Sequence, residues 1–135
     1  MTHISVLIQN VAGPEGKVLI GKKDDGKWAL PADVLHTGED PARACIRIAW
    51  EQLHIDVRAG KLEMRGLRKK TGGCHEYFSA VCTRQQRPDD GWFVETAWVH
   101  PMELDRYEFD GDDGKFMAKY VPWLWCRQIP DVRLD

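Results

Sequence analysis

The sequence predicts a single domain of the α+β class, and three features of the 135-residue chain support this prediction. Apolar residues alternate with polar or small ones between His3 and Asn10, which indicates a strand. A long amphipathic helix begins at Pro41, and further alternating segments follow it. The length and the hydrophobic content of 43% suit one compact domain over residues 1–135, large enough to bury a core without disulfides or metals.

The charge balance limits the classes of partner that the chain is expected to bind. The net charge is −2, from 19 basic and 21 acidic residues, so it provides no electrostatic footprint for duplex nucleic acid. No apolar run approaches the roughly 20 residues of a membrane-spanning helix. The N-terminus lacks the basic and apolar regions of a secretory signal. We therefore expect a cytoplasmic protein with a small-molecule or protein partner and no membrane association.

The central helix has the strongest local signals. Asp40 can cap its first turn, and Pro41 follows at the first helical position, where proline's missing N–H group costs nothing. An apolar stripe at helical spacing should face the core. This stripe comprises Ala42, Cys45, Ile46, Ala49 and Leu53, whereas Arg43, Arg47, Glu51 and His54 fall on other sides.

The segments around this helix read mainly as strands. Before the helix, residues 18–20 form a second strand, and a polar turn follows it. After the helix, we predict a strand at 61–70, a turn at 71–73, a strand at 75–84 and a loop at 85–91. Residues 92–100 contain a last candidate strand at Glu95–Val99.

The C-terminal part is predicted to contain two helices. A short helix opens at Pro101, residues 110–114 are interpreted as a solvated loop and helix N-terminus, and a final helix starts at Lys115 and is kinked or ended by Pro122. Residues 123–126 then form an apolar aromatic cluster. This cluster either packs against the sheet or forms a subunit interface, which leaves a homodimer open.

The stretch around the central helix resembles the signature of the Nudix hydrolases. That signature is Gly, five residues, Glu, seven residues, then Arg-Glu-U-x-Glu-Glu-x-Gly-U, with U an aliphatic residue. Glu39, Arg47, Glu51 and Ile55 match it in register, and residues 28–31 (Trp-Ala-Leu-Pro) are similar to the family's Trp-x-Leu-Pro lead-in. The resemblance implies a MutT-like Nudix fold, in which a mixed sheet is sandwiched between helices (α/β/α).

Four positions depart from the signature. Asp33 replaces its first Gly, Ile48 and Gln52 replace two of three helix glutamates, and His54 replaces its last Gly. In the family, these glutamates hold Mg²⁺ or Mn²⁺ against a diphosphate so that water can attack phosphorus. The resemblance thus leaves Glu51 as the metal ligand, and we expect weak binding of Mg²⁺ or Mn²⁺, because one carboxylate remains.

The resemblance also assigns roles outside the metal ligands. Glu39 and Arg47 match the family's structural pair, in which the arginine braces the loop before the helix. Some family members take their general base from a downstream loop, which makes Glu95 the leading candidate here, with Asp89 and Asp90 as others. Lys22 and Lys23 either contact substrate phosphate or lie on a solvated strand edge.

Two functional hypotheses follow. The first is a diverged pyrophosphohydrolase of nucleoside diphosphate-linked compounds, with Glu51 and Glu95 as catalytic residues. The second is a Nudix-fold module that binds a diphosphate ligand or a protein without turning it over. Ile48 bears on this choice, because an aliphatic residue on this flank indicates either a covered flank or a cleft reshaped for a less charged ligand.

Overall fold

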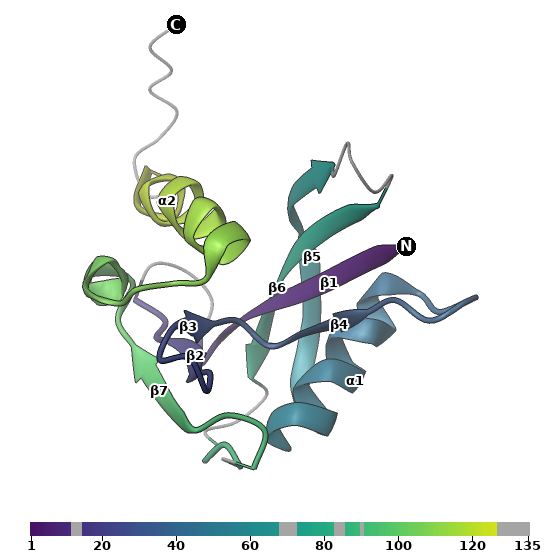
Figure 1. Cartoon of the computed structure of the whole chain (residues 1–135), viewed down its shortest axis with the longest axis horizontal. Coiled ribbons are helices and arrows are strands. Elements are labelled where there is room, and N and C mark those ends of the chain that lie inside the picture. The colour runs from purple at the N-terminus through teal and green to yellow at the C-terminus, as the bar shows by residue number, and fades with distance from the viewer. Residues whose placement is uncertain (12–14, 68–72, 83–85, 90, 127–135) are drawn as a thin grey trace, which may run out of the picture.

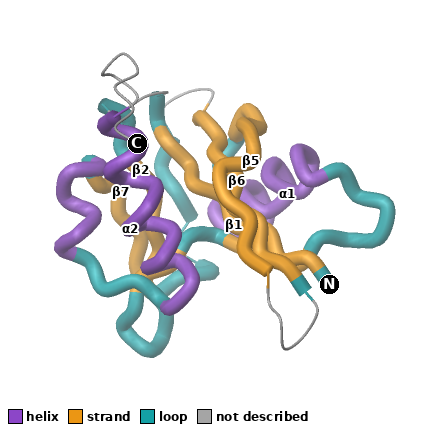
Figure 2. The backbone as a smooth tube through the Cα atoms, turned by 90° about the horizontal axis from the view of Figure 1, so that it is seen from above, coloured by secondary structure: helices purple, strands orange, loops and turns teal. Residues whose placement is uncertain are grey.

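The computed structural model describes residues 1–11, 15–67, 73–82, 86–89 and 91–126. The domain has three layers, with helix α1 on one face of a mixed sheet and helix α2 on the other (Figures 1 and 2). The helices are α1 (Pro41–Leu53), the 3₁₀ helix η1 (Pro101–Arg106) and α2 (Gly111–Cys126). The strands are β1 (Thr2–Gln9), β2 (Val18–Lys22), β3 (Trp28–Ala29), β4 (Ala32–Val34), β5 (Val57–Leu67), β6 (Cys74–Cys82) and β7 (Glu95–Val99). The predicted α+β class and α/β/α layering are confirmed.

Strand β1 is the centre of the sheet. One of its edges runs parallel to β6 over its full length, from Thr2 to Gln9. Its other edge is shared between two antiparallel partners, since β4 pairs with residues 3–5 and β2 pairs at Gln9. β5 continues the sheet beyond β6, while β3 and β7 both pair with β2. The sheet therefore splits into two halves that meet at β1.

Two hydrophobic cores occupy the two faces of the sheet. Alternation along β1 sends Ile4, Val6 and Ile8 to the face that α1 covers. Leu7 points the other way, into a core with Phe116 of α2. All four β1 side chains are fully buried, so the strand has no face toward solvent over these residues.

Helix α1 is rotated relative to the predicted stripe. Its buried positions are Ala44, Cys45, Ile48, Ala49, Gln52 and Leu53. Ile46, which the stripe placed in the core, is 43% exposed, so that prediction was wrong. Ile48 instead is 0% exposed and belongs to the α1 core. The helix turns the flank with Ile48 and Gln52 inward because it packs on β1 and β5 and because Gln52 bonds to Ala32 of β4. Spacing alone does not place these strands.

The five predicted strands are present, most of them with different ends, and the structure also contains the short strands β3 and β4, which were not predicted. The predicted strand at 61–70 begins earlier, at Val57, and its bulge passes Gly60, where an added Cβ would lie 1.9 Å from the Ser79 carbonyl oxygen. β5 and β6 pair antiparallel, as a hairpin requires. Of the predicted turn at 71–73, residues 71 and 72 lie outside the described part of the chain. The candidate strand at Glu95–Val99 is observed with these bounds.

The C-terminal helix begins before its predicted start. It spans Gly111–Cys126, so it starts four residues before Lys115 and continues past Pro122, which does not end it. The side chains of the cluster at 123–126 lie outside the described residues, and the choice between core packing and a subunit interface stays a prediction. No helix in the described ranges is long and apolar enough to span a membrane.

The two isoleucines on α1 provide a matched test of this orientation. Ile48→Glu should lower the free energy of unfolding by about 3 kcal/mol or more, because the new carboxylate has no cation partner in the α1 core. Ile46→Glu should change it by less than about 0.5 kcal/mol, since this position is exposed. Urea unfolding of both variants measures the difference, and equal effects would contradict the observed rotation.

Candidate functional site

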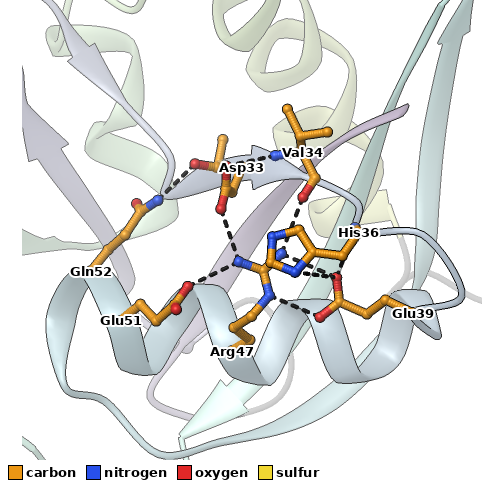
Figure 3. Close-up of polar contacts among 8 residues, drawn as sticks. Asp33, Val34, His36, Glu39, Arg47, Glu51 and Gln52 are labelled. Carbon is orange, nitrogen blue, oxygen red and sulfur yellow. Dashed lines mark hydrogen bonds and ion pairs between the residues drawn. The ribbon is translucent and has the colours of Figure 1, made fainter. Parts of the chain in front are cut away.

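Arg47 of α1 is the centre of a polar network that also includes Asp33, Val34, Glu39 and Glu51 (Figure 3). We call this network the hub. The Arg47 guanidinium makes two hydrogen bonds to Glu39, from Nε at 2.8 Å and from Nη2 at 3.1 Å. Nη1 donates to Asp33 at 2.8 Å and to Glu51 at 2.9 Å, and Nη2 also donates to the Val34 carbonyl oxygen at 3.1 Å. One cation therefore joins the helix to β4 and to the intervening loop.

Local sequence signals prepare this arrangement. Asp40 has extended backbone geometry and accepts the Ala42 N–H at 3.0 Å, so the predicted N-cap is confirmed. Glu39 accepts the His36 N–H at 3.0 Å, which closes the loop just before the cap. The loop thus presents the Glu39 carboxylate to Arg47 in the second turn of α1.

The hub changes the titration of its members. The hydrogen bonds from Arg47 hold the pKa values of Asp33 and Glu39 below their ordinary range, because they favour the ionised carboxylates. The same contacts, with Glu39 first, raise the pKa of Arg47. Asp33 stands where the signature has glycine, so this chain adds a carboxylate to the hub.

The flank of α1 that carries three glutamates in the Nudix signature has only one carboxylate in this chain. Ile48 is in the core, and Glu51 has an exposed side chain that bonds to Arg47. Gln52 is 4% exposed, and its Nε2 donates to the Ala32 carbonyl oxygen at 2.7 Å. Its Oε1 is buried without a described hydrogen-bond partner. The flank thus offers one ion-paired carboxylate and one neutral amide oxygen.

This donor set does not fit a divalent metal centre. Mg²⁺ prefers hard, charged oxygen ligands in octahedral geometry, and an aliphatic side chain occupies one of the three ligand positions. Within the described residues, no group of three or more His, Cys, Asp or Glu side chains is arranged to hold a metal ion. The side chains at positions 48, 51 and 52 therefore do not supply the ligands that the family's divalent metal ion requires.

A pocket of about 600 Å³ lies beside this flank. We call it the acidic pocket, because four aspartates line it, Asp24, Asp110, Asp112 and Asp113. Gln52 contributes to its wall from α1, and Trp92 and Phe93 contribute from the segment before β7. A pocket of this volume can hold a small organic ligand.

Phe93 reaches the pocket wall because Gly21 lacks a side chain. A Cβ on Gly21 would lie 2.3 Å from the Phe93 ring, so the ring occupies the space above β2. Phe93 is 8% exposed, whereas its neighbours Trp92 and Val94 are 64% and 62% exposed. The segment is therefore anchored by one aromatic ring, with apolar residues at the pocket on either side of it.

The floor of the acidic pocket is built by Asp113. Its carboxylate accepts the Tyr77 hydroxyl at 2.6 Å and the Leu30 backbone N–H at 2.9 Å. Burial raises the pKa of Asp113, because desolvation disfavours the charged form. The prediction of a solvated loop at 110–114 was wrong for this residue, which is 7% exposed. The early start of α2 turns it inward, beneath the sheet residue Tyr77.

His75 forms a second polar group in the pocket. Its Nε2 lies 2.6 Å from the Ser5 hydroxyl oxygen, and its Nδ1 lies 3.6 Å from the nearer Asp112 carboxylate oxygen. Its ring stacks on Tyr77 at a centroid distance of 4.4 Å. Ser5, His75 and Asp113 were missed as site residues, because only the pairing of β1 with β6 and the docking of α2 bring them together.

The structure separates the site residues that the sequence predicted. Lys23 lines the acidic pocket and donates to Asp110, and this contact raises the pKa of Lys23 and lowers that of Asp110. Lys22 ends β2 opposite Glu95, which starts β7 and is exposed. Neither Lys22 nor Glu95 is among the pocket residues.

Of the other candidate bases, Asp89 is not among the pocket residues. The Asp89 carboxylate lies 2.9 Å from His54 Nδ1, and the Asp89 backbone N–H donates to the Leu53 carbonyl oxygen at 2.9 Å. Asp89 therefore fastens the 86–89 segment to the C-terminal end of α1. Asp90 lies outside the described residues.

Comparison with known proteins establishes the family. The NUDIX domain family model matches residues 1–124, so the chain belongs to the Nudix family. The suspected membership and the MutT-like fold are thereby confirmed. Hydrolases of this family generally use divalent metals, which makes the altered flank of α1 the feature that needs explanation. A search of curated proteins found no match.

Solved structures show the same fold at low sequence identity. The Escherichia coli ORF135 protein has a TM-score of 0.75 and 16% identity, over 96% of this chain and 94% of that one. A MutT protein from Methanosarcina mazei Go1 has a TM-score of 0.70 and 16% identity, over 97% and 96% of the two chains. The NUDIX domain of Shewanella oneidensis NrtR, complexed with ADP ribose, has a TM-score of 0.66 and 12% identity, over 92% and 88%.

Removal of the hub cation should destabilise the fold. Arg47→Ala should lower the free energy of unfolding by about 2 kcal/mol, because Glu39 and Asp33 lose charge-assisted hydrogen bonds. Arg43→Ala is the control, since Arg43 is exposed on the same helix and should change stability by less than about 0.5 kcal/mol. Thermal unfolding compares the two, and an unchanged melting temperature for Arg47→Ala would show that the hub is not structural.

The hub should also make stability depend on acid pH. Asp33 and Glu39 have depressed pKa values in the folded state, so the unfolded state binds more protons. Their contribution is complete above the ordinary carboxyl range near pH 4 and is lost as the pH falls through the depressed values. Urea midpoints from pH 7 to pH 3 should therefore fall less in Arg47→Ala than in the wild type. Parallel profiles would contradict this assignment.

Proposed function

We propose that this Nudix domain binds a nucleoside diphosphate-linked compound in the acidic pocket and hydrolyses it slowly or not at all. The observation that carries the proposal is the replacement of the metal-binding flank of α1. Ile48 is part of the core and Gln52 bonds to a backbone carbonyl, while a pocket of about 600 Å³ lies beside Gln52. The site therefore offers space for a ligand but lacks two of the three helix carboxylates that would bind a metal ion.

The expected loss of catalysis is large. General-base assistance contributes about 10²- to 10⁴-fold, and a metal ion adds several kcal/mol of charge stabilisation. Neither is supplied by Ile48 or by the amide of Gln52. We expect turnover to be at least about 10²-fold below that of a Nudix site with three helix carboxylates.

Family membership supports the ligand class. The similar NUDIX domain of NrtR was solved with ADP ribose, which is a nucleoside diphosphate linked to a sugar. A pocket of about 600 Å³ has room for the nucleoside part of such a compound. The diphosphate would then leave the pocket on the side of Lys23, with Lys22 as a further contact for its charge.

In this proposal, divalent metal ions and the acidic residues Glu51 and Glu95 contribute to residual turnover and not to ligand binding. Glu51 is the remaining carboxylate that could approach Mg²⁺ or Mn²⁺ bound to the diphosphate, and its bond to Arg47 competes with that role. Glu95 is the proposed base for any residual turnover. Both residues should be dispensable for binding, so Glu51→Gln and Glu95→Gln should leave the dissociation constant within about twofold of the wild type.

One experiment decides between binding and hydrolysis. Calorimetry measures the binding of ADP ribose and other nucleoside diphosphate derivatives. The same compounds are then incubated with the protein in Mg²⁺ and in Mn²⁺, and the products are analysed. We expect a dissociation constant in the micromolar range, about −8 kcal/mol, with little or no product. Rapid turnover that Glu51→Gln or Glu95→Gln abolishes would identify a hydrolase instead. Absence of both binding and turnover across the panel would overturn the proposal.

A further inference from the structure

Trp92 is an exposed aromatic residue at the acidic pocket. It is 64% exposed and is one of the residues that line the pocket, so a ligand in the pocket can reach it. Tryptophan is on average a highly buried residue, because its side chain carries a large apolar area. Trp92 therefore leaves apolar surface in water at a place where a ligand can cover it.

The residues that follow Trp92 hold it in place. The Phe93 ring occupies the space above Gly21 and belongs to the α1 core. The Val94 backbone N–H donates to the Lys22 carbonyl oxygen at 2.9 Å, which extends the contact between β7 and β2. Because the backbone is anchored next to Trp92, a ligand pays less conformational entropy to order this side chain than it would on a free loop.

The charges of the pocket indicate which part of a ligand lies against Trp92. The described pocket residues include four aspartates and one lysine, and that lysine, Lys23, is paired with Asp110. This excess of carboxylates repels a diphosphate and does not repel an uncharged ring. In a nucleoside diphosphate-linked compound, the base is the part that combines an aromatic face with the absence of formal charge. Stacking of a base on an aromatic side chain increases affinity about tenfold.

We propose that Trp92 is a specificity-determining residue on which the base of a bound nucleoside diphosphate-linked compound stacks. This inference rests on the proposed function and defines its ligand class further. A purine covers more of the indole ring than a pyrimidine does, so purine compounds bind more tightly. Trp92 lies outside the Nudix signature around α1, so base recognition and the altered metal-binding flank are separate parts of the site.

Two ligands that differ only in the base test the inference. ADP-glucose and UDP-glucose have the same sugar and the same diphosphate, and the purine offers the larger stacking area. In calorimetry, the wild type should bind ADP-glucose at least about threefold more tightly than UDP-glucose. Free adenosine is measured as a base without the diphosphate, and tryptophan fluorescence is recorded in each titration.

Trp92→Leu is the informative variant. It removes the aromatic face, so the dissociation constant for ADP-glucose should rise about tenfold and the preference for the purine should disappear. Trp92→Phe keeps an aromatic face and should retain most of the affinity and the preference. Trp50→Leu is the matched control, because Trp50 is 50% exposed on α1 and is not among the pocket residues. It should keep the wild-type affinity for both compounds.

The outcomes separate this inference from the proposed function. An unchanged affinity in Trp92→Leu would overturn the role of Trp92 while the binding function stands. An equal loss for both sugar nucleotides would do the same, since it places the contact at the shared sugar or diphosphate. Fluorescence quenching by adenosine that Trp92→Leu abolishes, without binding of either sugar nucleotide, would support Trp92 and overturn the proposed function. Absence of binding for all three compounds would overturn both.

Discussion

The contact on which α1 and the loop before it depend is that of the Arg47 guanidinium with its carboxylate partners. It ties the helix to the loop through Glu39 and to β4 through Asp33, and it also engages Glu51. A single always-ionised group therefore holds the N-terminal part of α1 in register with the sheet. Because the same group neutralises the surviving carboxylate of the signature, the contacts that maintain the fold also reduce the charge available for catalysis.

The fold and the chemistry of the Nudix signature are separable in this chain. The bracing pair remains, whereas Ile48 has joined the core and Gln52 has turned its amide to a backbone carbonyl. An acid at position 48 would have to be desolvated among the apolar residues of the α1 core, which disfavours a charged side chain there. Family membership and catalytic competence are therefore distinct conclusions, and the second depends on these two side chains.

Local signals predicted much of the fold, and long-range packing explains what they missed. The cap at Asp40 and the strand alternation in β1 depend on neighbouring residues, and both agree with the structure. The rotation that exposes Ile46 depends on how strands lie against the helix, which spacing does not reveal. The pocket was beyond prediction for a related reason, because Ser5 and Asp113 are brought together by the docking of α2.

The central position of β1 also determines how the domain opens. The strand has partners on both edges, and its apolar side chains are fully buried toward both helices. Its inner amides can reach solvent only when both cores separate, so their hydrogen exchange reports the opening of the whole domain. The exposed residues on either side of Phe93 lie at the opposite extreme. Exchange there reports local motion of the pocket wall, and the two regions together distinguish a ligand that orders the wall from one that stabilises the entire fold.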